Sequence, residues 1–268
     1  DTLWTKTYND LSGFMEMQKS SNGNYRALLY TKTKRYAMAE INEAGVIQWQ
    51  KEIPLQPNIN LDKIQKVPGG YYAFGEINSD YLFAKLNENL DTLYTKVIDR
   101  GTLDIQGSLL FRNNHVYIAG FCDNVPNEAL RGFISELDTN NGHELYTKFY
   151  CHNGSDTSGM GIYRGLIHVA GLADFNTQTF YAAARADYTA GISYFEPTRF
   201  GLLKLDNNSD SAWSKYYWFP SKLVGDDIPQ GIVYSPIDST LAIYGMHNDI
   251  AWPPISSNLQ NFGIIKTD

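Results

Sequence analysis

Four aspartates precede segments that have the composition of β-strands, and they are the first candidates for chemistry. They are Asp10, Asp104, Asp156 and Asp227, and a glycine follows three of them at a spacing of three residues (Gly13, Gly107 and Gly159). At the equivalent place a fifth stretch offers Asn58, Asn60 and Asp62. Two carboxyls about 5–5.5 Å or 6.5–9.5 Å apart would form the catalytic pair of a glycosidase. Aspartate and glycine also favour turns at strand entry without any ligand, so both interpretations stay open.

Aromatic residues gather in two long segments near the end of the chain. Residues 174–199 hold Phe175, Phe180, Tyr181, Tyr188, Tyr194 and Phe195, and residues 248–261 hold Trp252 ahead of two prolines. Aromatic walls with a few polar groups are the usual form of a ligand pocket. We therefore take Tyr188 and Trp252 as ligand-binding candidates together with the four aspartates. The alternative is that these aromatics pack their own loops or contact a neighbouring protein.

Other kinds of chemistry find little support. The five histidines are scattered and none stands at a metal-ligand spacing to another. The chain has no nucleophile elbow, phosphate-binding loop or dinucleotide fingerprint. The run from Asp138 to Glu144 contains some residues of a calcium loop but is better explained as a turn. We expect no metal, no cofactor and no identifiable catalytic residue, which leaves enzymatic activity undecided and disfavoured.

Charge and hydropathy limit the partners. The formal net charge is −7 and the pI is about 5.2, and we expect no cluster of lysine and arginine anywhere in the chain. Phosphate backbones require clustered cations, so nucleic acid is not expected as a partner. No apolar run approaches the roughly 18 residues of a membrane span, so no transmembrane segment is expected.

The elements that would position these residues belong to a repeat. An aromatic residue followed two positions later by lysine recurs at intervals of 45 to 67 residues: Trp4–Lys6, Trp49–Lys51, Tyr94–Lys96, Tyr146–Lys148 and Trp213–Lys215. A second recurring run lies just before four of these motifs, and a fifth copy stands at the end of the sequence. The copies are Tyr36–Asn42, Tyr81–Asn87, Gly132–Asp138, Phe200–Asp206 and Phe262–Asp268. Polar turns separate the two runs, as in a β-hairpin. We interpret the recurring aromatics as core plugs between units and the recurring lysines as solvated or paired surface charges.

A further hairpin accompanies each of these, with clear copies at residues 64–75, 109–120, 161–171 and 231–245. Each unit therefore has four strands, A to D, and such units repeated around an axis are β-propeller blades. Strand D at Leu3–Tyr8 and strand C at Phe262–Asp268 complement each other. We expect one all-β domain over residues 1–268, a five-bladed β-propeller with four antiparallel strands per blade, closed by the N-terminal strand in the last blade. The alternative is a slice of a longer propeller.

Two stretches carry a family resemblance. Asp1-Thr-Leu-Trp-Thr-Lys-Thr-Tyr8 and Lys85-Leu-Asn-Glu-Asn-Leu-Asp-Thr-Leu-Tyr-Thr-Lys96 resemble repeats of secreted β-propeller proteins of Bacteroidetes. The strand-D aromatic resembles the tryptophan of quinoprotein-type (PQQ-like) blades. Members are typically exported, often within larger surface proteins, which implies a secreted, cell-surface or periplasmic location. These motifs concern blade geometry, and without a quinone-binding constellation no redox cofactor is carried over.

The function hypotheses follow from loop lengths. The excess residues of the last three blades lie between strands B and C, at residues 122–131, 174–199 and 248–261. In a propeller these B–C loops and the D–A loops that carry the aspartates emerge on one face. We expect a non-catalytic binding or scaffold module that binds a protein partner or a glycan on this face. The alternatives are a glycoside-active enzyme that uses the aspartates and a purely structural spacer.

A disulfide between Cys122 and Cys151 is a final expectation. These are the only two cysteines, and exported proteins tend to pair them. Strand C lies between the two strands that they follow, so strand spacing places them about 9–10 Å apart. A bridge needs Cα atoms within about 4.4–6.8 Å, so the loops after both strands would have to bend over strand C.

Overall fold

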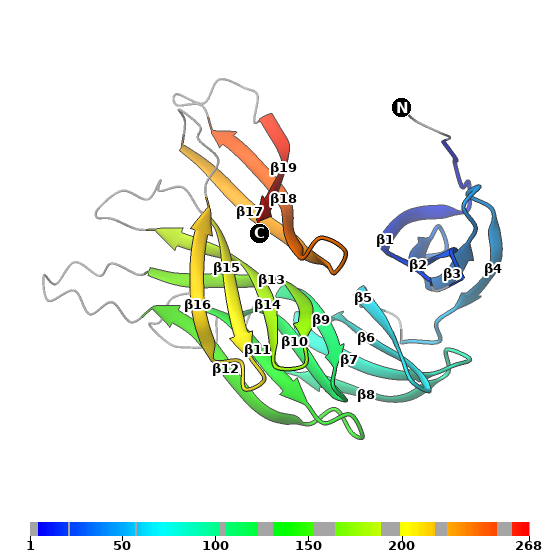
Figure 1. Cartoon of the computed structure of the whole chain (residues 1–268). Helices are drawn as coiled ribbons and strands as arrows, with labels where there is room; N and C mark the ends of the chain where they lie inside the picture. Colours follow the sequence, from blue (N-terminus) through cyan, green and yellow to red (C-terminus); the bar gives the residue numbers. More distant parts are fainter. Residues whose placement is uncertain are drawn as a thin grey trace, which may run out of the picture. The chain divides into compact units, whose positions relative to one another are not determined.

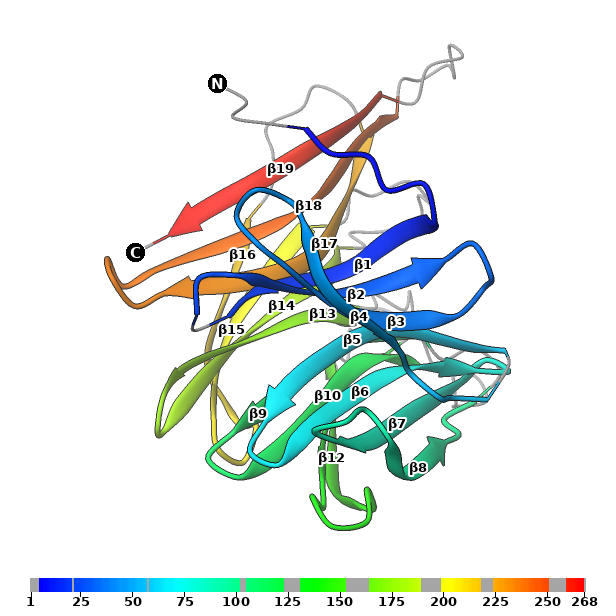
Figure 2. The same ribbon diagram turned by 90° about the vertical axis from the view of Figure 1, so that its right-hand side faces the viewer.

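The computed structural model describes residues 5–20, 22–56, 58–101, 105–122, 131–152, 164–188, 199–217, 224–250 and 259–267. All regular elements in these ranges are β-strands, and they form successive antiparallel blades (Figures 1 and 2). The chain is an all-β, five-bladed β-propeller, as the repeat predicts. By its internal contacts it divides into two compact units, Asp1–Asp99 and Arg100–Asp268. The single domain expected over residues 1–268 stays a prediction.

The N-terminal unit holds blades one and two, each a four-stranded meander. Blade one comprises β1 (Leu11–Lys19), β2 (Tyr25–Thr31), β3 (Tyr36–Ile41) and β4 (Ile47–Glu52). Blade two comprises β5 (Ile59–Val67), β6 (Gly70–Ile77), β7 (Asp80–Asn87) and β8 (Thr92–Ile98). Registers such as Ile41↔Ile47 between β3 and β4 and Val67↔Gly70 between β5 and β6 follow the predicted hairpins. A core that includes Leu28, Met38, Leu61 and Leu82 joins the two sheets.

The C-terminal unit holds blades three to five. Blade three comprises β9 (Ile105–Arg112), β10 (His115–Cys122), β11 (Arg131–Leu137) and β12 (Glu144–His152). Blade four comprises β13 (Arg164–Asn176), β14 (Thr179–Tyr188), β15 (Arg199–Asp206) and β16 (Ser211–Tyr217). Blade five comprises β17 (Val224–Ser235), β18 (Thr240–Ile250) and β19 (Leu259–Thr267). Two residue pairs between β12 and β13 merge blades three and four into one eight-stranded sheet.

Blade four corrects the strand assignment made from the sequence. The stretch 166–171 belongs to strand A, since β13 runs on to Asn176, and strand B is β14. Phe180 and Tyr181 were assigned to an inserted loop, yet they lie in β14 and are 0% and 7% exposed. The sequence pattern did not predict β14 as a strand because it contains four alanines, a residue that is depleted in strands. In the structure these small side chains allow the sheets of this unit to approach closely.

Blade five has three strands within the described residues, where four were predicted. The predicted fourth strand is Leu3–Tyr8, of which residues 1–4 lie outside the described part of the chain. Residues 5–8 have no strand assignment, so pairing beside β19 stays a prediction. Within the described chain, the hydroxyl of Tyr8 donates to the carbonyl of Gly45 in the β3–β4 turn, at 2.6 Å.

Glycines on strand A allow neighbouring blades to approach. A Cβ added to Gly107 in β9 would lie 1.9 Å from the carbonyl oxygen of Val169 in β13. A Cβ added to Gly171 in β13 would lie 2.8 Å from the backbone nitrogen of Ile232 in β17. Only a residue without Cβ fits at such distances. The glycine that follows Asp104 at a spacing of three residues therefore serves blade packing, whatever role the aspartate has.

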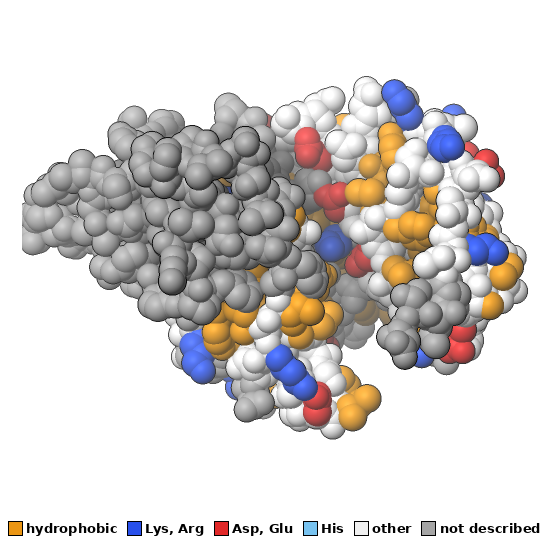
Figure 3. Space-filling model, turned by 90° about the horizontal axis from the view of Figure 1, so that it is seen from above, with side chains coloured by type: hydrophobic (Ala, Val, Ile, Leu, Met, Phe, Trp, Pro, Cys, Tyr) orange, Lys and Arg blue, Asp and Glu red, His pale blue; other side chains and the backbone are white. Residues whose placement is uncertain are grey.

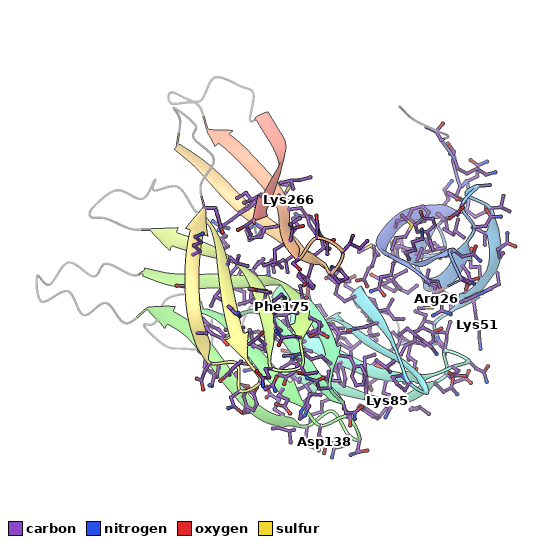
Figure 4. The ribbon with its side chains drawn as sticks, viewed as in Figure 1. Arg26, Lys51, Lys85, Asp138, Phe175 and Lys266 are labelled. Atoms are coloured by element: carbon purple, nitrogen blue, oxygen red, sulfur yellow. The ribbon has the colours of Figure 1, made fainter. Side chains whose placement is uncertain are left out.

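Two lysines of the repeated motif form ion pairs with the next blade. Lys51 of β4 lies 3.7 Å from Asp91 in the β7–β8 turn, and Lys148 of β12 pairs with Asp210 in the β15–β16 turn (Lys51 labelled in Figure 4). Both acids stand at the same position of their turn. The prediction of paired surface charges is confirmed for these two blades.

The aromatic residues of the motif divide into two kinds. Tyr146 packs against the core between blades three and four, and its hydroxyl donates to the carbonyl of Asn207 at 3.2 Å. This residue is the predicted core plug. Trp49 is 37% exposed, so for blade one that interpretation is wrong.

Candidate functional site

The predicted site residues are only partly within the described chain. Asp10 lies exposed in the turn before β1, and its carbonyl accepts a hydrogen bond from the backbone nitrogen of Lys32 at 3.1 Å. Asp227 lies within β17 opposite His247, and Tyr188 ends β14 opposite Arg164, so neither stands in a loop as expected. The remaining three, Asp104, Asp156 and Trp252, lie outside the described residues. The assignment of these six residues as ligand-binding stays a prediction.

Several aromatics assigned to the loop face belong to the core instead. The ring of Phe175, labelled in Figure 4, makes edge contacts with Tyr181 and Tyr234 at centroid distances of 5.1 and 4.9 Å. Strand β13 ends one residue after Phe175, so the ring packs blade four against blade five. Phe175, Phe180 and Tyr181 therefore neither line a loop face nor pack a loop, since they lie in strands and belong to the core between sheets.

The cysteines flank one strand, as expected. Cys122 ends β10 and is buried, opposite Arg131 of β11. Cys151 lies in β12, one residue after Tyr150, which pairs with Gly132 of β11. Two strand spacings, about 9–10 Å, separate such positions. The side chain of Cys151 lies outside the described residues, and the disulfide stays a prediction.

A pocket does occur on the predicted face, in the N-terminal unit. It has a volume of about 490 Å³ and opens between the β2–β3 turn and the β4–β5 loop. These are the B–C turn of blade one and the following D–A loop, so the two loop types do share a face here. We call it the loop pocket, and its lining is Tyr30, Thr33, Lys34, Arg35, Tyr36, Ile53, Leu55, Gln56, Asn58, Ile59 and Asn60.

The loop pocket has an apolar floor and a polar rim. Ile53, Ile59 and Tyr36 are 4%, 7% and 8% exposed, whereas the amides of Gln56, Asn58 and Asn60 belong to exposed residues. Tyr30 faces Tyr36 across the hairpin, with ring centroids 5.1 Å apart. Burial raises the pKa of the Tyr36 phenol, against the effect of a hydrogen bond from the Leu61 backbone. At neutral pH this hydroxyl is therefore a neutral group.

The turn on one side of the loop pocket is held rigidly. The hydroxyl of Thr31, a buried residue, accepts from the backbone nitrogen of Arg35 at 3.1 Å and donates to its carbonyl at 3.0 Å. The backbone nitrogen of Lys34 donates to the carbonyl of Thr31 at 3.0 Å. Lys34 itself has a φ of 59°, a left-handed conformation that these bonds fix. Two cationic residues are thus presented from a turn of defined shape.

This turn is what the sequence analysis missed. Lys32, Lys34 and Arg35 place three cations within four residues, so the statement that no lysine and arginine cluster exists is wrong for this turn. The signal is present in the sequence, in a short B–C turn that has no inserted residues. Asn58 and Asn60, in contrast, were singled out and do line the pocket.

Metal and membrane features find no support in the described chain. No group of three histidines, cysteines or acids in the described ranges could hold a metal ion. Among the same residues no helix is long and apolar enough to cross a membrane. On the described surface that Figure 3 shows, cationic and acidic side chains are interspersed.

The chain is similar to known proteins in fold alone. No family model matches it, and no curated protein matches its sequence. A protein of unknown function from Bacteroides caccae is 16% identical, with a TM-score of 0.52 over 80% of this chain and 71% of that one. The PQQ-bound form of an aldose sugar dehydrogenase from Streptomyces coelicolor is 14% identical, with a TM-score of 0.50 over 97% and 82%. At such identities these likenesses support the propeller fold and carry no activity across.

Proposed function

We propose that this chain is a non-catalytic binding module of an exported or cell-surface protein and that it binds a saccharide in the loop pocket of blade one. The observation that supports this is the lining of a pocket of about 490 Å³ on the face predicted for binding. Small-ligand sites usually enclose about 300–1,000 Å³, with apolar walls and a few convergent polar groups. The buried floor and the three rim amides have this composition.

A saccharide fits these groups better than a wholly apolar ligand does. Its ring faces pack on apolar and aromatic surface, and its hydroxyls require both donors and acceptors. The side-chain amide of each of Gln56, Asn58 and Asn60 offers both. The lining contains no carboxylate, so it lacks the pair of acids that glycoside hydrolysis requires. Binding without cleavage is the activity that this composition supports.

The test is a titration of the full chain with a panel of free saccharides, followed by calorimetry or ligand-observed NMR. The variant Asn58→Ala/Asn60→Ala is compared with Asn208→Ala, which removes an exposed amide from a turn of blade four. We expect the double variant to lose at least threefold in affinity and the control to bind as the parent does. Binding to none of the saccharides would overturn the proposal and favour a protein partner. Release of reducing sugar from an oligosaccharide would contradict the non-catalytic part.

A further inference from the structure

The loop pocket differs in charge from the molecule that carries it. Two of its lining residues, Lys34 and Arg35, are cationic and none is acidic. The chain as a whole has a formal net charge of −7. A lining with two cations and no acid favours an anionic ligand over a cationic one. From this contrast we infer that the saccharide bound in the loop pocket carries a carboxylate, as hexuronic acids do. This inference rests on the proposed function and specifies its ligand class.

The position of the two cations supports recognition rather than general solubility. Both stand in the turn that the Thr31 hydroxyl closes, so the backbone that carries them is ordered before any ligand arrives. A preorganised site loses less conformational freedom on binding than a mobile one. Lys32 stands in the same turn and is also exposed, yet it does not line the pocket. The turn therefore directs two of its three cations to the pocket.

Arg35 already binds a carboxylate loosely. Its guanidinium lies 3.6 Å from the carboxylate of Glu52, and the two side chains are 63% and 53% exposed. Exposed pairs of this kind contribute little, typically under about 1 kcal/mol. A guanidinium can hold a carboxylate through two parallel hydrogen bonds, which is a stronger arrangement. A ligand carboxylate could thus replace Glu52 at small cost, while Lys34 adds a second positive charge.

The remaining lining residues complete a place for a sugar acid. The carboxylate would lie at Lys34 and Arg35, and the ring hydroxyls would meet the amides of Asn58 and Asn60 across the pocket. The ring face would rest on the apolar floor that includes Ile53. A neutral hexose could satisfy the amides but would offer no negative charge to Lys34 and Arg35. Acidic and neutral sugars of the same configuration therefore differ at one end of the pocket only.

The experiment compares galacturonic acid and its di- and trisaccharides with galactose and the matching neutral oligosaccharides. Affinities for the full chain are measured by calorimetry or ligand-observed NMR in dilute buffer and in about 0.5 M salt. Variants Lys34→Gln and Arg35→Gln remove the pocket cations singly. Lys32→Gln is the matched control, because it makes the same charge change in the same turn outside the pocket. Melting temperatures show whether each variant keeps its fold.

We expect the acidic sugars to bind at least fivefold more tightly than the neutral ones, with the preference reduced in high salt. Each pocket variant should weaken the acid about tenfold and the neutral sugar less than twofold, whereas Lys32→Gln should change neither. Equal affinity for acid and neutral sugar would overturn the inference and leave the proposed function standing. Acid binding that survives both pocket variants would overturn it too. Binding of neither class would reject the proposed function itself.

Discussion

The hydroxyl of Tyr8 donates a hydrogen bond to the backbone carbonyl of Gly45, and the two oxygens are 2.6 Å apart. The hydroxyl of Tyr150 makes the same bond, also 2.6 Å, to the carbonyl of Ser209. Tyr8 and Tyr150 each stand four residues after the aromatic residue of the repeated motif, and each acceptor lies in the turn between strands C and D. Tyr8 therefore makes the same contact with blade one that Tyr150 of β12 makes with blade four.

The first prediction concerns this N-terminal segment. Tyr8→Phe and Tyr150→Phe should each lower the free energy of unfolding by about 0.5–1.5 kcal/mol, because each removes one partly buried hydrogen bond. Deletion of residues 1–8 should have a larger effect and promote aggregation, since it removes the strand predicted to cover an exposed sheet edge. Urea unfolding and light scattering measure the two effects. A shortened chain as soluble and heat-stable as the parent would contradict closure by this segment.

The second prediction concerns an arginine buried between blades three and four. The guanidinium of Arg112, 1% exposed, lies 3.0 Å from the carboxylate of Asp174 and 5.1 Å from the ring centre of Phe180. Asp174→Asn leaves a buried positive charge without its counter-charge and should cost about 1–3 kcal/mol of stability. Asp210→Asn makes the same change in the exposed pair with Lys148 and should cost less than about 1 kcal/mol. Equal losses in urea unfolding would argue against this difference in burial.

The third prediction is a pH dependence at Glu16. Its carboxylate accepts a hydrogen bond from the backbone nitrogen of Ile64 at 2.7 Å, which links β1 to β5. Burial raises the pKa of this carboxyl, against the opposing effects of Lys63 and the Ile64 hydrogen bond. The folded state therefore holds the proton more tightly than the unfolded state. The contribution of Glu16 to stability falls as pH rises from its ordinary pKa through the raised one.

Glu16→Gln keeps an oxygen acceptor for Ile64 and removes the titration. We expect the free energy of unfolding of this variant, relative to that of the parent, to be higher at about pH 7 than at about pH 3.5. Urea unfolding at both pH values measures this difference. Glu43→Gln is the control, because Glu43 is exposed and its carboxylate lies as far as 4.0 Å from the ammonium group of Lys19. Its stability relative to the parent should hardly change between the two pH values. A gain no larger than the control's would mean that water solvates the Glu16 carboxylate in the fold.

The fourth prediction introduces an acid into the loop pocket. Asn60→Asp places a negative charge on the rim and should weaken the binding of galacturonate at least fivefold, because like charges repel at close range. Asn208→Asp changes the net charge of the protein equally in a turn of blade four and should leave affinity unchanged. Calorimetry on both variants checks this. A similar loss in the two variants would indicate attraction by the whole molecule and not by the pocket.

Much of this fold was predictable because propeller blades repeat hairpins. Asn42, Asn87 and Asp206 each end the first of two β-type runs and so mark the turn between strands C and D. The structure has a hairpin at each of these places. Strand B of blade four was not predicted, because Ala182, Ala183 and Ala184 have low strand propensity and do not alternate between polar and apolar residues. Their burial arises from packing against other blades, a long-range effect that a local pattern does not contain.

The candidate site was less predictable for a related reason. Asn58 and Asn60 were found because they occupy the place of the aspartates in the repeat. Lys34 and Arg35 were not, since a short polar turn is ordinary between two strands. These two residues line a pocket because residues 53–60 lie opposite them in space. In the sequence, two strands separate this loop from the turn that carries Lys34 and Arg35. A pocket made by two loops has no signature in either one alone.

The turn residues that receive the tyrosine hydroxyls have a consequence for how such repeats diverge. Gly45, Leu90 and Ser209 share one place in three blades and one left-handed conformation, with φ of 71°, 64° and 59°. Two of them are acceptors through the backbone carbonyl, and Leu90 lies in the core that includes Ile53 of the preceding blade. The contact with the neighbouring blade therefore requires a backbone conformation, which glycine, leucine and serine all adopt at this position. Neutral drift can erase sequence likeness at this position while the junction between blades persists, so duplicated units can grow dissimilar without coming apart.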